Sequence, residues 1–348
     1  MPQVVKAGKV PLLIITIDGG TTNTRVRILE KEKIVGKASL PIGVRCTAIT
    51  SRKEALLKGL RRIIDMALKE ARVRQEDIHL AIASGMITSN VGVYELAHVA
   101  SPAGVNELAA ASRLVKVPEV LDVPIVFIPG IKNNCVIRED LSNLEAMDIM
   151  RGEETETVGI LELKSLDGPL TLILPGSHTK VVRVNEHNQI TGCLTTMAGE
   201  IFTTLAANTI LADSIPDTLV SYLDVDIFLK GVAVSRDVGL TRGCFATRIL
   251  SQFASIDGNR RASFLLGVVL GQDLTAIKNS SACGCNWCDP VVIGGPQPLR
   301  QAMYWLLKTD PDITGEIVLL DDETVEMSTV IGARKIGLKY LEMVGGLR

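Results

Sequence analysis

The stretch LLIITIDGGTTNTRVRIL at residues 12–29 decides the fold, because a related stretch, LTLILPGSHTKVVRV, follows at residues 170–184. Each copy is an apolar run, a turn of small and hydroxyl-bearing residues, and a second apolar run, which predicts a β-hairpin. A shift of 156 positions places Gly20 on Gly176. We therefore expect two related halves, each built around such a hairpin.

The same shift also aligns residues beyond the two turns. It places Arg27 on Arg183 and, in the next apolar segment, Gly36 on Gly192. Turns rich in glycine, threonine and serine expose backbone N–H groups and hydroxyls, which suit phosphate oxygens. Two such turns facing each other across a cleft would hold a nucleoside triphosphate from both sides. The repeat therefore predicts a nucleoside-triphosphate site between the two halves.

Composition limits the class of protein. At 348 residues the chain is long for one core, so two domains are expected. The net charge of −2 and the aromatic content of 3% argue against a nucleic-acid surface. No apolar run reaches the length of a transmembrane helix, so no membrane span is expected. Seven scattered cysteines fit a reducing cytoplasm better than a disulfide framework, which favours a cytoplasmic protein.

The pattern of strands and helices predicts an α/β fold with a mixed sheet in each half. Strands are expected three times within 12–40, in the second hairpin, and at 78–83, 124–128, 290–293 and 316–320. Helices are expected at 52–72, 103–115, 153–163, 200–212, 222–234, 242–255, 260–278 and 328–344, and after Pro298.

An Asp-Gly-Pro sequence within residues 164–169 is the clearest candidate domain boundary. We therefore predict an N-terminal domain of residues 1–168 that carries the first turn. Residues 169–327 would form a C-terminal nucleotide-binding domain. A C-terminal helix at 328–348 would pack back onto the first domain.

The first turn supplies a carboxylate and a set of phosphate contacts. An Asp at the end of a buried strand is costly unless it is paired or holds a metal, so Asp18 is expected to orient Mg²⁺. A tight hairpin that happens to use Gly and Thr is the structural alternative. The expected phosphate contacts are Gly19, Gly20, Thr21, Thr22 and Asn23.

The second turn and a later Gly-Gly sequence complete the expected nucleotide site. Lys180 has an equally good explanation as a solvated strand residue. A strand followed by Gly294 and Gly295 lets the backbone approach the adenosine closely. The expected phosphate contacts of the second turn are Gly176, Ser177, His178 and Thr179.

Three carboxylates compete for the role of catalytic base. Phosphoryl transfer to a hydroxyl benefits from a carboxylate that accepts the substrate proton. Glu153 and Glu154 stand at an expected helix start, where helix capping explains them equally well. Asp148, in the polar segment before that helix, is the preferred candidate.

Three cysteines lie close together near the end of the chain. Cys283, Cys285 and Cys288 could bind Zn²⁺ with one more ligand, but no histidine follows at zinc-finger spacing. A structural or incidental cluster is the favoured interpretation.

Several phrases resemble the 2-dehydro-3-deoxygalactonokinase family of the sugar kinase, actin and Hsp70 superfamily. The family phrase M-R-G-E-E-T is identical at residues 150–155. The family phrases D-W-G-T-T-N-x-R, C-G-M-x-G-S, C-P-A-G, P-G-T-H-S-K and M-T-G-E-x-F are similar to residues 18–25, 84–89, 101–104, 175–180 and 197–202. Gly19 replaces an aromatic residue, and Ser84 and Ser101 replace cysteines.

The resemblance implies two actin- and hexokinase-like (ribonuclease H-like) domains with ATP in the cleft between them, and it implies that the domain of residues 1–168 binds the sugar acid. It implies Mg²⁺- and ATP-dependent phosphorylation of 2-dehydro-3-deoxy-D-galactonate at its 6-hydroxyl in galactonate catabolism, and a homodimer is conceivable. The substrate carboxylate should need cationic or amide groups. The expected substrate contacts are Arg25, Arg45, Gly85, Met86, Asn90 and Arg151.

Two other functions remain open from the sequence. One is a kinase of the same fold that acts on another sugar, sugar acid or polyol. The other is a non-catalytic ATP-binding regulator with an actin-like cleft. The carboxylates near Asp148 and the intact first turn favour an enzyme.

Overall fold

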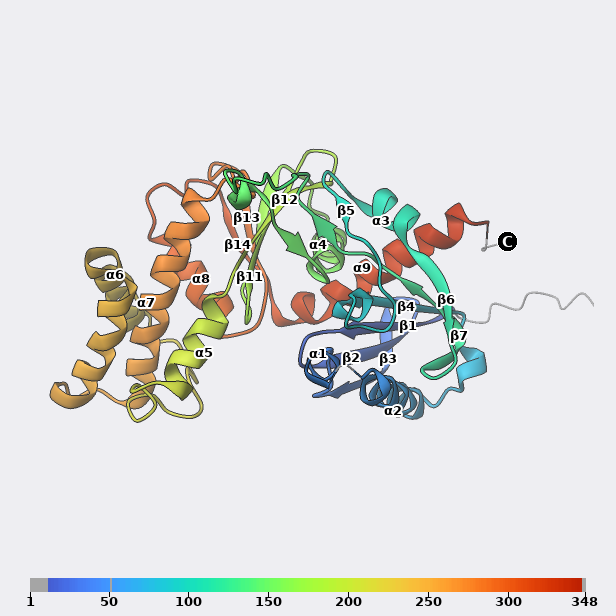
Figure 1. The fold of residues 1–348 in the computed structure, drawn as a ribbon, viewed down its shortest axis with the longest axis horizontal. Helices are drawn as coiled ribbons and strands as arrows, with labels where there is room; N and C mark the ends of the chain where they lie inside the picture. The colour runs from blue at the N-terminus through green and yellow to red at the C-terminus, as the bar shows by residue number, and fades with distance from the viewer. Residues whose placement is uncertain (1–11, 51, 346–348) are drawn as a thin grey trace, which may run out of the picture.

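The computed structural model describes residues 12–50 and 52–345, which form two large mixed sheets with helices on both faces of each, and one small three-stranded sheet (Figure 1). Residues 1–11 and 346–348, at the two ends of the predicted domain ranges, lie outside these limits, as does residue 51. Three hydrophobic clusters fill the spaces between the layers. The order of layers is helix, sheet, helix pair, sheet and helices.

The first sheet has the strand order β3-β2-β1-β4-β7-β6. Its strands are β1 (Leu13–Gly19), β2 (Thr24–Glu30), β3 (Lys33–Leu40), β4 (Leu80–Gly85), β6 (Arg113–Val117) and β7 (Leu121–Phe127). Apolar residues every third or fourth position give helix α2 (Glu54–Ala71) one buried face, which packs on the outer side of this sheet. Parallel pairing of β1 with β4 leaves both central strands almost wholly buried.

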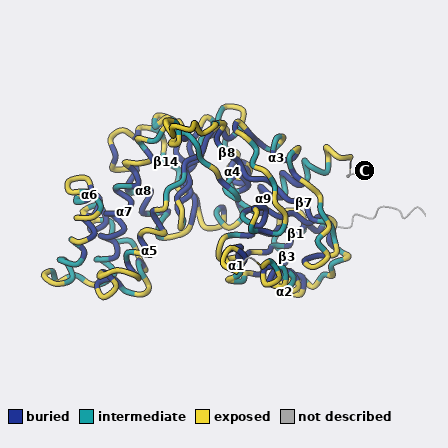
Figure 2. Tube along the Cα trace, viewed as in Figure 1, coloured by how far each residue is buried: buried dark blue, intermediate teal, exposed yellow. Residues whose placement is uncertain are grey.

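The second sheet repeats this arrangement with the order β12-β11-β10-β13-β14. Its strands are β10 (Leu170–Leu174), β11 (Thr179–Val184), β12 (Ile190–Thr196), β13 (Val291–Ile293) and β14 (Ile317–Leu319). The outer helices are α5 (Ala198–Asn208), α6 (Val225–Phe253), α7 (Gly258–Asn279) and α8 (Leu299–Lys308). Figure 2 shows buried segments running through the centre of both halves.

Two helices lie between the sheets and contribute to the hydrophobic cluster that the two sheets share. Helices α4 (Glu153–Lys164) and α9 (Asp322–Met343) contribute to one cluster that also contains side chains of both sheets. They approach closely through Gly159 and Gly332. A Cβ on Gly159 would collide with the carbonyl oxygen of Ser328, and one on Gly332 with that of Thr155. The predicted return of the last helix onto the first half corresponds to the contacts of α9 with β1, β4 and α3.

Short elements connect the layers. They are α1 (Arg45–Thr50), α3 (Val105–Ala111), β5 (Val99–Ala100), β8 (Ile131–Lys132), β9 (Ile149–Met150) and 3₁₀ turns at Gln75–Asp77, Met86–Thr88 and Leu144–Ala146. Ala103 and Ile190 exchange backbone hydrogen bonds of 2.9 and 2.8 Å, which join the first half to β12. The division into domains at residue 168 stays a prediction.

The repeat is real but shifts by one residue inside the hairpins. Ile14 and Leu170, which are 156 residues apart, both face the middle core, whereas Leu29 on β2 corresponds to Val184, which is 155 residues further on. The predicted equivalence of Arg27 and Arg183 is therefore wrong. Their side chains point to opposite faces of their sheets because the second turn is one residue shorter.

Two predicted helices differ from the structure. Helix α3 ends at Ala111, and the residues expected to continue it to 115 enter strand β6 because they pair with β7. The helices expected at 222–234 and 242–255 form one element, α6, interrupted at Gly239, whose φ of 79° is non-helical. Across the described ranges, no helix combines the length and apolar character needed to span a membrane.

Candidate active site

A cleft of about 910 Å³ opens between the two halves and is lined by both glycine-rich turns. The first turn follows β1 and the second follows β10, so the two turns are supplied by the corresponding edges of the two sheets. Helices α4 and α9 form the base of the cleft, and α5 forms one wall. Figure 1 shows α4 and α9 between the two sheets.

The first turn is held by a backbone hydrogen bond within the turn and by another from the start of α1. The N–H of Gly20 donates to the carbonyl of Asn23 at 2.8 Å, and the N–H of Arg45 donates to the carbonyl of Thr21 at 2.9 Å. Gly43 packs against this turn so closely that a Cβ would collide with the carbonyl oxygens of Gly20 and Thr21. The shape of the first turn thus depends on a second segment that passes over it.

The second turn is supported in the same way by the start of α5. The N–H of Glu200 donates to the carbonyl of Ser177 at 2.8 Å, and a Cβ on Gly199 would collide with the carbonyl oxygen of Gly176. Gly43 and Gly199 are 156 residues apart, so the repeat extends to the supporting segments. His178 lies 2.9 Å from Glu200, and both side chains line the cleft.

Three glycines meet at the floor of the cleft. A Cβ on Gly85 would lie 2.8 Å from the carbonyl oxygen of Gly19, and one on Gly152 would lie 3.3 Å from Cα of Gly85. Gly85 and Gly152 have φ values of 84° and 117°, which favour glycine. A Cβ on Gly19 would lie 2.6 Å from Cβ of Ile87, so Ile87 occupies the space that a larger residue at position 19 would need.

Among the carboxylates that line the cleft, three come from the end of β1 and the start of α4. Asp18 ends β1, and Glu153 and Glu156 lie one helical turn apart on α4. Burial, together with the charges of Glu153 and Asp18, raises the pKa of Glu156 to about 8. Burial also raises the pKa of Asp18, although Arg25 opposes the shift from 3.4 Å. Sequence reasoning missed Glu156, which the i, i+3 spacing from Glu153 could have revealed.

The other two predicted carboxylates lie elsewhere. Asp148 accepts hydrogen bonds from the backbone N–H and the hydroxyl of Thr195, at 2.6 and 2.7 Å, and so ties the segment before β9 to β12. Glu154 is fully buried, and both of its oxygens accept from the N–H of Gly152. Burial, followed by the charge of Glu153, raises the pKa of Glu154 to about 8. Neither side chain contributes to the lining of the cleft within the described ranges.

The predicted arginines differ in how free their guanidinium groups are. Arg25 and Arg45 are exposed on the cleft. Arg151 also lines it, but its guanidinium donates to the carbonyls of Thr88 and Leu96 at 2.7 and 2.9 Å, so it braces the cleft wall. An unpredicted fourth arginine, Arg27, faces the cleft 3.5 Å from a carboxylate oxygen of Glu326 on α9.

The structure brings most of the predicted site residues together. The cleft is lined by Asp18, Gly19, Gly20, Thr21, Thr22, Arg25, Arg45, Gly85, Met86, Arg151, Glu153, Gly176, Ser177, His178 and Gly295. Asn23, Asn90, Asp148, Glu154, Thr179 and Gly294 stand outside that lining, among the residues that the structure describes. Gly295 has a φ of 78° and packs against the carbonyl of Pro175. Packing against the second turn is therefore enough to explain a glycine at this position.

Within residues 12–50 and 52–345, no group of three or more His, Cys, Asp or Glu side chains could hold a metal ion by itself. This holds for Cys283, Cys285 and Cys288, and all seven cysteines of the chain are free thiols. A cation in the cleft would therefore need phosphate oxygens and water among its ligands, as Mg²⁺ commonly does in phosphoryl-transfer enzymes.

A sequence model of the 2-keto-3-deoxy-galactonokinase family matches residues 18–310. A Rhizobium meliloti (strain 1021) protein named "Probable 2-dehydro-3-deoxygalactonokinase DgoK1" is 30% identical over 156 residues. That alignment spans 45% of this chain and 44% of the relative, so less than half of the curated relative is matched.

Solved structures share the fold. A Sinorhizobium meliloti protein assigned as a 2-dehydro-3-deoxygalactonokinase superimposes with a TM-score of 0.69 at 23% identity, covering 93% of this chain and 99% of the other. Component A of (R)-2-hydroxyglutaryl-CoA dehydratase from Acidaminococcus fermentans gives 0.50 at 14% identity, covering 96% and 99%. The predicted actin-like, two-domain fold class is confirmed, and because the family model spans most of its length, the chain belongs to the 2-keto-3-deoxy-galactonokinase family.

Proposed function

We propose that this chain is an ATP-dependent kinase that phosphorylates 2-dehydro-3-deoxy-D-galactonate at its 6-hydroxyl. The observation that carries the proposal is one cleft lined by both glycine-rich turns, by the carboxylates at the end of β1 and the start of α4, and by two exposed arginines. Family membership supports this sugar acid over other substrates. A soluble metabolic role in the cytoplasm fits the free thiols, because reducing compartments keep cysteines unpaired.

The triphosphate of ATP would lie between the two turns. Backbone N–H groups and the hydroxyls of Thr21, Thr22 and Ser177 are suited to its oxygens. The adenosine would extend along the wall formed by Gly295, Pro296 and α5. This placement leaves the space beside the first half for the sugar acid.

Asp18 fits the role of holding Mg²⁺. Its carboxylate lies in the cleft at the end of β1, where burial raises its pKa and Arg25 opposes that shift. A bound Mg²⁺ would supply positive charge where negative charge develops on the phosphoryl group. Asp18 would orient that ion, and Arg25 would balance the remaining carboxylate charge.

Glu153 takes the place of Asp148 as the proposed base. Of the three carboxylates that the sequence offers as the catalytic base, Glu153 is the one that lines the cleft. Its Oε2 accepts a hydrogen bond of 3.1 Å from the N–H of Arg151. A carboxylate in this position would accept the proton of the attacking hydroxyl as the phosphoryl group moves. Asp148 would instead hold the two halves together through Thr195.

Arg45 and Arg25 are the proposed contacts for the substrate carboxylate. Both guanidinium groups are exposed on the cleft, whereas Arg151 is engaged with backbone carbonyls. A guanidinium can bind a carboxylate through two parallel hydrogen bonds, which favours a sugar acid over a neutral sugar.

The deciding experiment is a coupled assay of ATP consumption against a panel of sugar acids, neutral sugars and polyols, using wild type and Arg45→Gln. We expect activity with 2-dehydro-3-deoxy-D-galactonate and a rise in its KM of about tenfold or more in the variant, because a charge-assisted contact is lost. Preference for a neutral sugar would favour the same-fold kinase of another substrate. ATP binding without turnover on any substrate would favour the non-catalytic regulator.

A further inference from the structure

The cleft contains a carboxylate that the proposed reaction does not use. Asp322, in the first turn of α9, lines the cleft, and its side chain is 87% exposed. Its Oδ1 accepts a hydrogen bond from Nη2 of Arg300 on α8, whereas its Oδ2 makes no hydrogen bond among the described residues. One oxygen is therefore held in place, and the other is open to a donor that enters the cleft.

The partner of Asp322 is a buried cation. Arg300 is 2% exposed, and its Nε and Nη1 find no hydrogen-bond partner in the part of the chain that the structure describes. A guanidinium is costly to bury unless its charge is compensated, and the carboxylate that compensates it here is Asp322. Because Arg300 is enclosed by protein, its side chain fixes where the exposed carboxylate of Asp322 stands.

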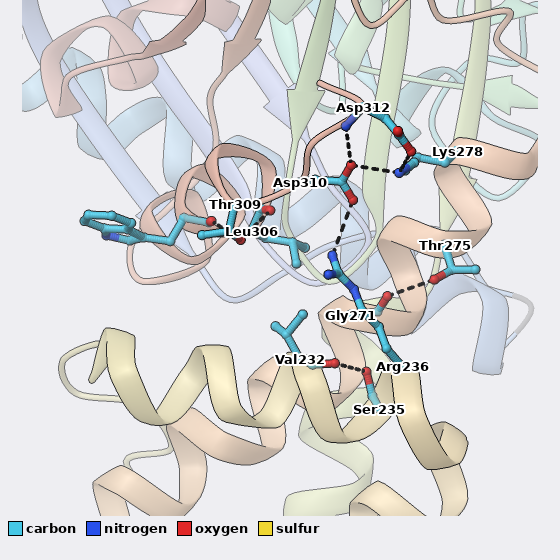
Figure 3. A network of polar contacts seen from close by, with 11 residues as sticks. Val232, Ser235, Arg236, Gly271, Thr275, Lys278, Leu306, Thr309, Asp310 and Asp312 are labelled. Atoms are coloured by element: carbon cyan, nitrogen blue, oxygen red, sulfur yellow. Dashed lines mark hydrogen bonds and ion pairs between the residues drawn. The ribbon is translucent and has the colours of Figure 1, made fainter. Parts of the chain in front are cut away.

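A buried charge at the other end of α8 is compensated differently. Asp310, two residues after α8, is buried and bonds to Lys278 and Arg236 at 2.8 and 3.3 Å, as Figure 3 shows. Within the described ranges, none of these three side chains lines the cleft. The pair of Arg300 and Asp322 is therefore unusual in joining a buried cation to a carboxylate in the cleft.

Asp322 stands beside the turn that contains Gly295. Strands β13 and β14 are parallel neighbours, and the N–H of Leu320 donates to the carbonyl of Ile293 at 3.0 Å. Both strands thus end at the same edge of the sheet, and the Gly295 turn follows one of them while Asp322 follows the other. In open α/β sheets, ligands bind outside the carboxyl ends of such strands.

A backbone contact and the strand order locate Asp322 relative to the phosphate-type turns. The N–H of Arg300 donates to the carbonyl of Pro296 at 3.0 Å, and Pro296 lines the cleft. In the sheet, β10, which carries the second turn at its end, is followed by β13 and then by β14. Because neighbouring strands are about 4.8 Å apart, the end of β14 lies about 10 Å from the second turn. Asp322 is therefore placed to contact the part of a nucleotide that follows its phosphates.

We propose that Asp322 binds the ribose of the nucleotide, with its Oδ2 accepting a hydrogen bond from a ribose hydroxyl, and that Arg300 is a positioning residue for this carboxylate. The proposal rests on the proposed function in placing the phosphates of ATP at the two turns and the adenosine beside Gly295. The group that follows the phosphates is the ribose, and a carboxylate accepts from its hydroxyl in dinucleotide-binding folds. Because Arg300 already compensates the charge of Asp322, a neutral hydroxyl fits this carboxylate better than a second Mg²⁺ does.

The test is calorimetric titration with ATP, 2′-deoxy-ATP and 3′-deoxy-ATP, each with Mg²⁺ and without sugar acid. Wild type should bind at least one of the two deoxynucleotides about tenfold or more weakly than ATP, because a hydrogen bond to a charged group is lost. Asp322→Ala should bind ATP more weakly by a similar factor. Its affinities for the three nucleotides should lie within about twofold of one another.

The matched control is Glu323→Ala, which removes an exposed carboxylate from the same turn of α9. Among the described residues, Glu323 is outside the lining of the cleft, so this variant should discriminate between the nucleotides as wild type does. Arg300→Met should lose most of the discrimination, and Arg300→Lys should keep part of it, since an ammonium can still pair with Asp322. A role of Arg300 in stability alone would lower the melting temperature without changing the ratio of affinities.

Two results overturn the inference. One is equal affinity of wild type for all three nucleotides, and the other is wild-type discrimination in Asp322→Ala. Should the Arg300 variants fail to fold, the comparison of Asp322→Ala with Glu323→Ala still decides, because both side chains are exposed. A wild type that binds no nucleotide contradicts the proposed function itself, so the two failures can be told apart.

Discussion

The two turns share a scaffold but not their chemistry. Both follow a central strand and both are supported by a glycine from a following segment, Gly43 in one case and Gly199 in the other. The first turn begins with Asp18, whereas the matching position before the second turn is Leu174, which belongs to the middle core. Under the proposed function, the duplicated hairpin would supply two phosphate-binding surfaces, and the carboxylate on one side alone would set where the reacting end of the nucleotide lies.

The largest effect is expected from making the first turn as uncharged as the second. Asp18→Asn should keep the fold but lower kcat by roughly 10³-fold, because charge stabilisation at the moving phosphoryl group is lost. The KM for ATP should change far less. Steady-state kinetics checks this, with Ser177→Ala in the second turn as the control. Near-normal turnover in Asp18→Asn would contradict the role of Asp18 in placing Mg²⁺.

The next largest effect distinguishes the two candidate bases. Glu153→Gln should lower kcat by about 10²-fold or more, since general-base assistance commonly contributes that much. Asp148→Asn, the matched control, should retain most of its kcat but melt at a lower temperature, because its bonds to Thr195 weaken. The reverse pattern of turnover in the two variants would return the role to Asp148.

A third pair of variants probes the supporting glycines. Gly199→Ala should displace the second turn and raise the KM for ATP by roughly tenfold, with kcat little changed. Gly43→Ala should disturb the turn that carries Asp18, and so lower kcat as well as ATP affinity. Equal kinetic effects in the two variants would show that the turns contribute in the same way.

The smallest effect concerns stability and pH. The pKa of Glu154 is raised from 4.5 to about 8 in the fold, so the native state binds the proton more tightly than the unfolded state. The free energy of unfolding therefore falls as the pH rises from 4.5 to about 8. Glu154→Gln removes this loss, so its melting temperature should exceed that of wild type more at about pH 8.5 than at about pH 5. The exposed Glu139→Gln is the control, and a parallel pH profile for wild type and Glu154→Gln would contradict the expectation.

Local patterns in the sequence predict much of this molecule, and the errors arise where distant segments meet. The hairpins follow from their apolar runs and from the repeat itself, and α2 follows from apolar residues at every third or fourth position. Helix α4 is also predicted at nearly its observed bounds. The surroundings of Asp148 could not be predicted, because Thr195, its partner, is 47 residues away on another sheet. Residues 113–115 continue a helical pattern but become a strand because β7 offers an edge to pair with.

Glu156 shows the same limit within the site. Glu156 lies on α4, a helix that the sequence predicts. Its side chain comes near Asp18 only because α4 is placed at the base of the cleft, below the two glycine-rich loops.

The close contact between Gly159 and Gly332 has a consequence for how the chain reaches its native state. Helix α9, the last described element to leave the ribosome, completes the core on the inner face of the first-made sheet. The early half can form its hairpins and pack α2 while synthesis continues, but its inner face stays open until α9 arrives. The nascent chain therefore exposes apolar surface for most of its synthesis, and a larger side chain at either glycine would extend that period without touching the cleft.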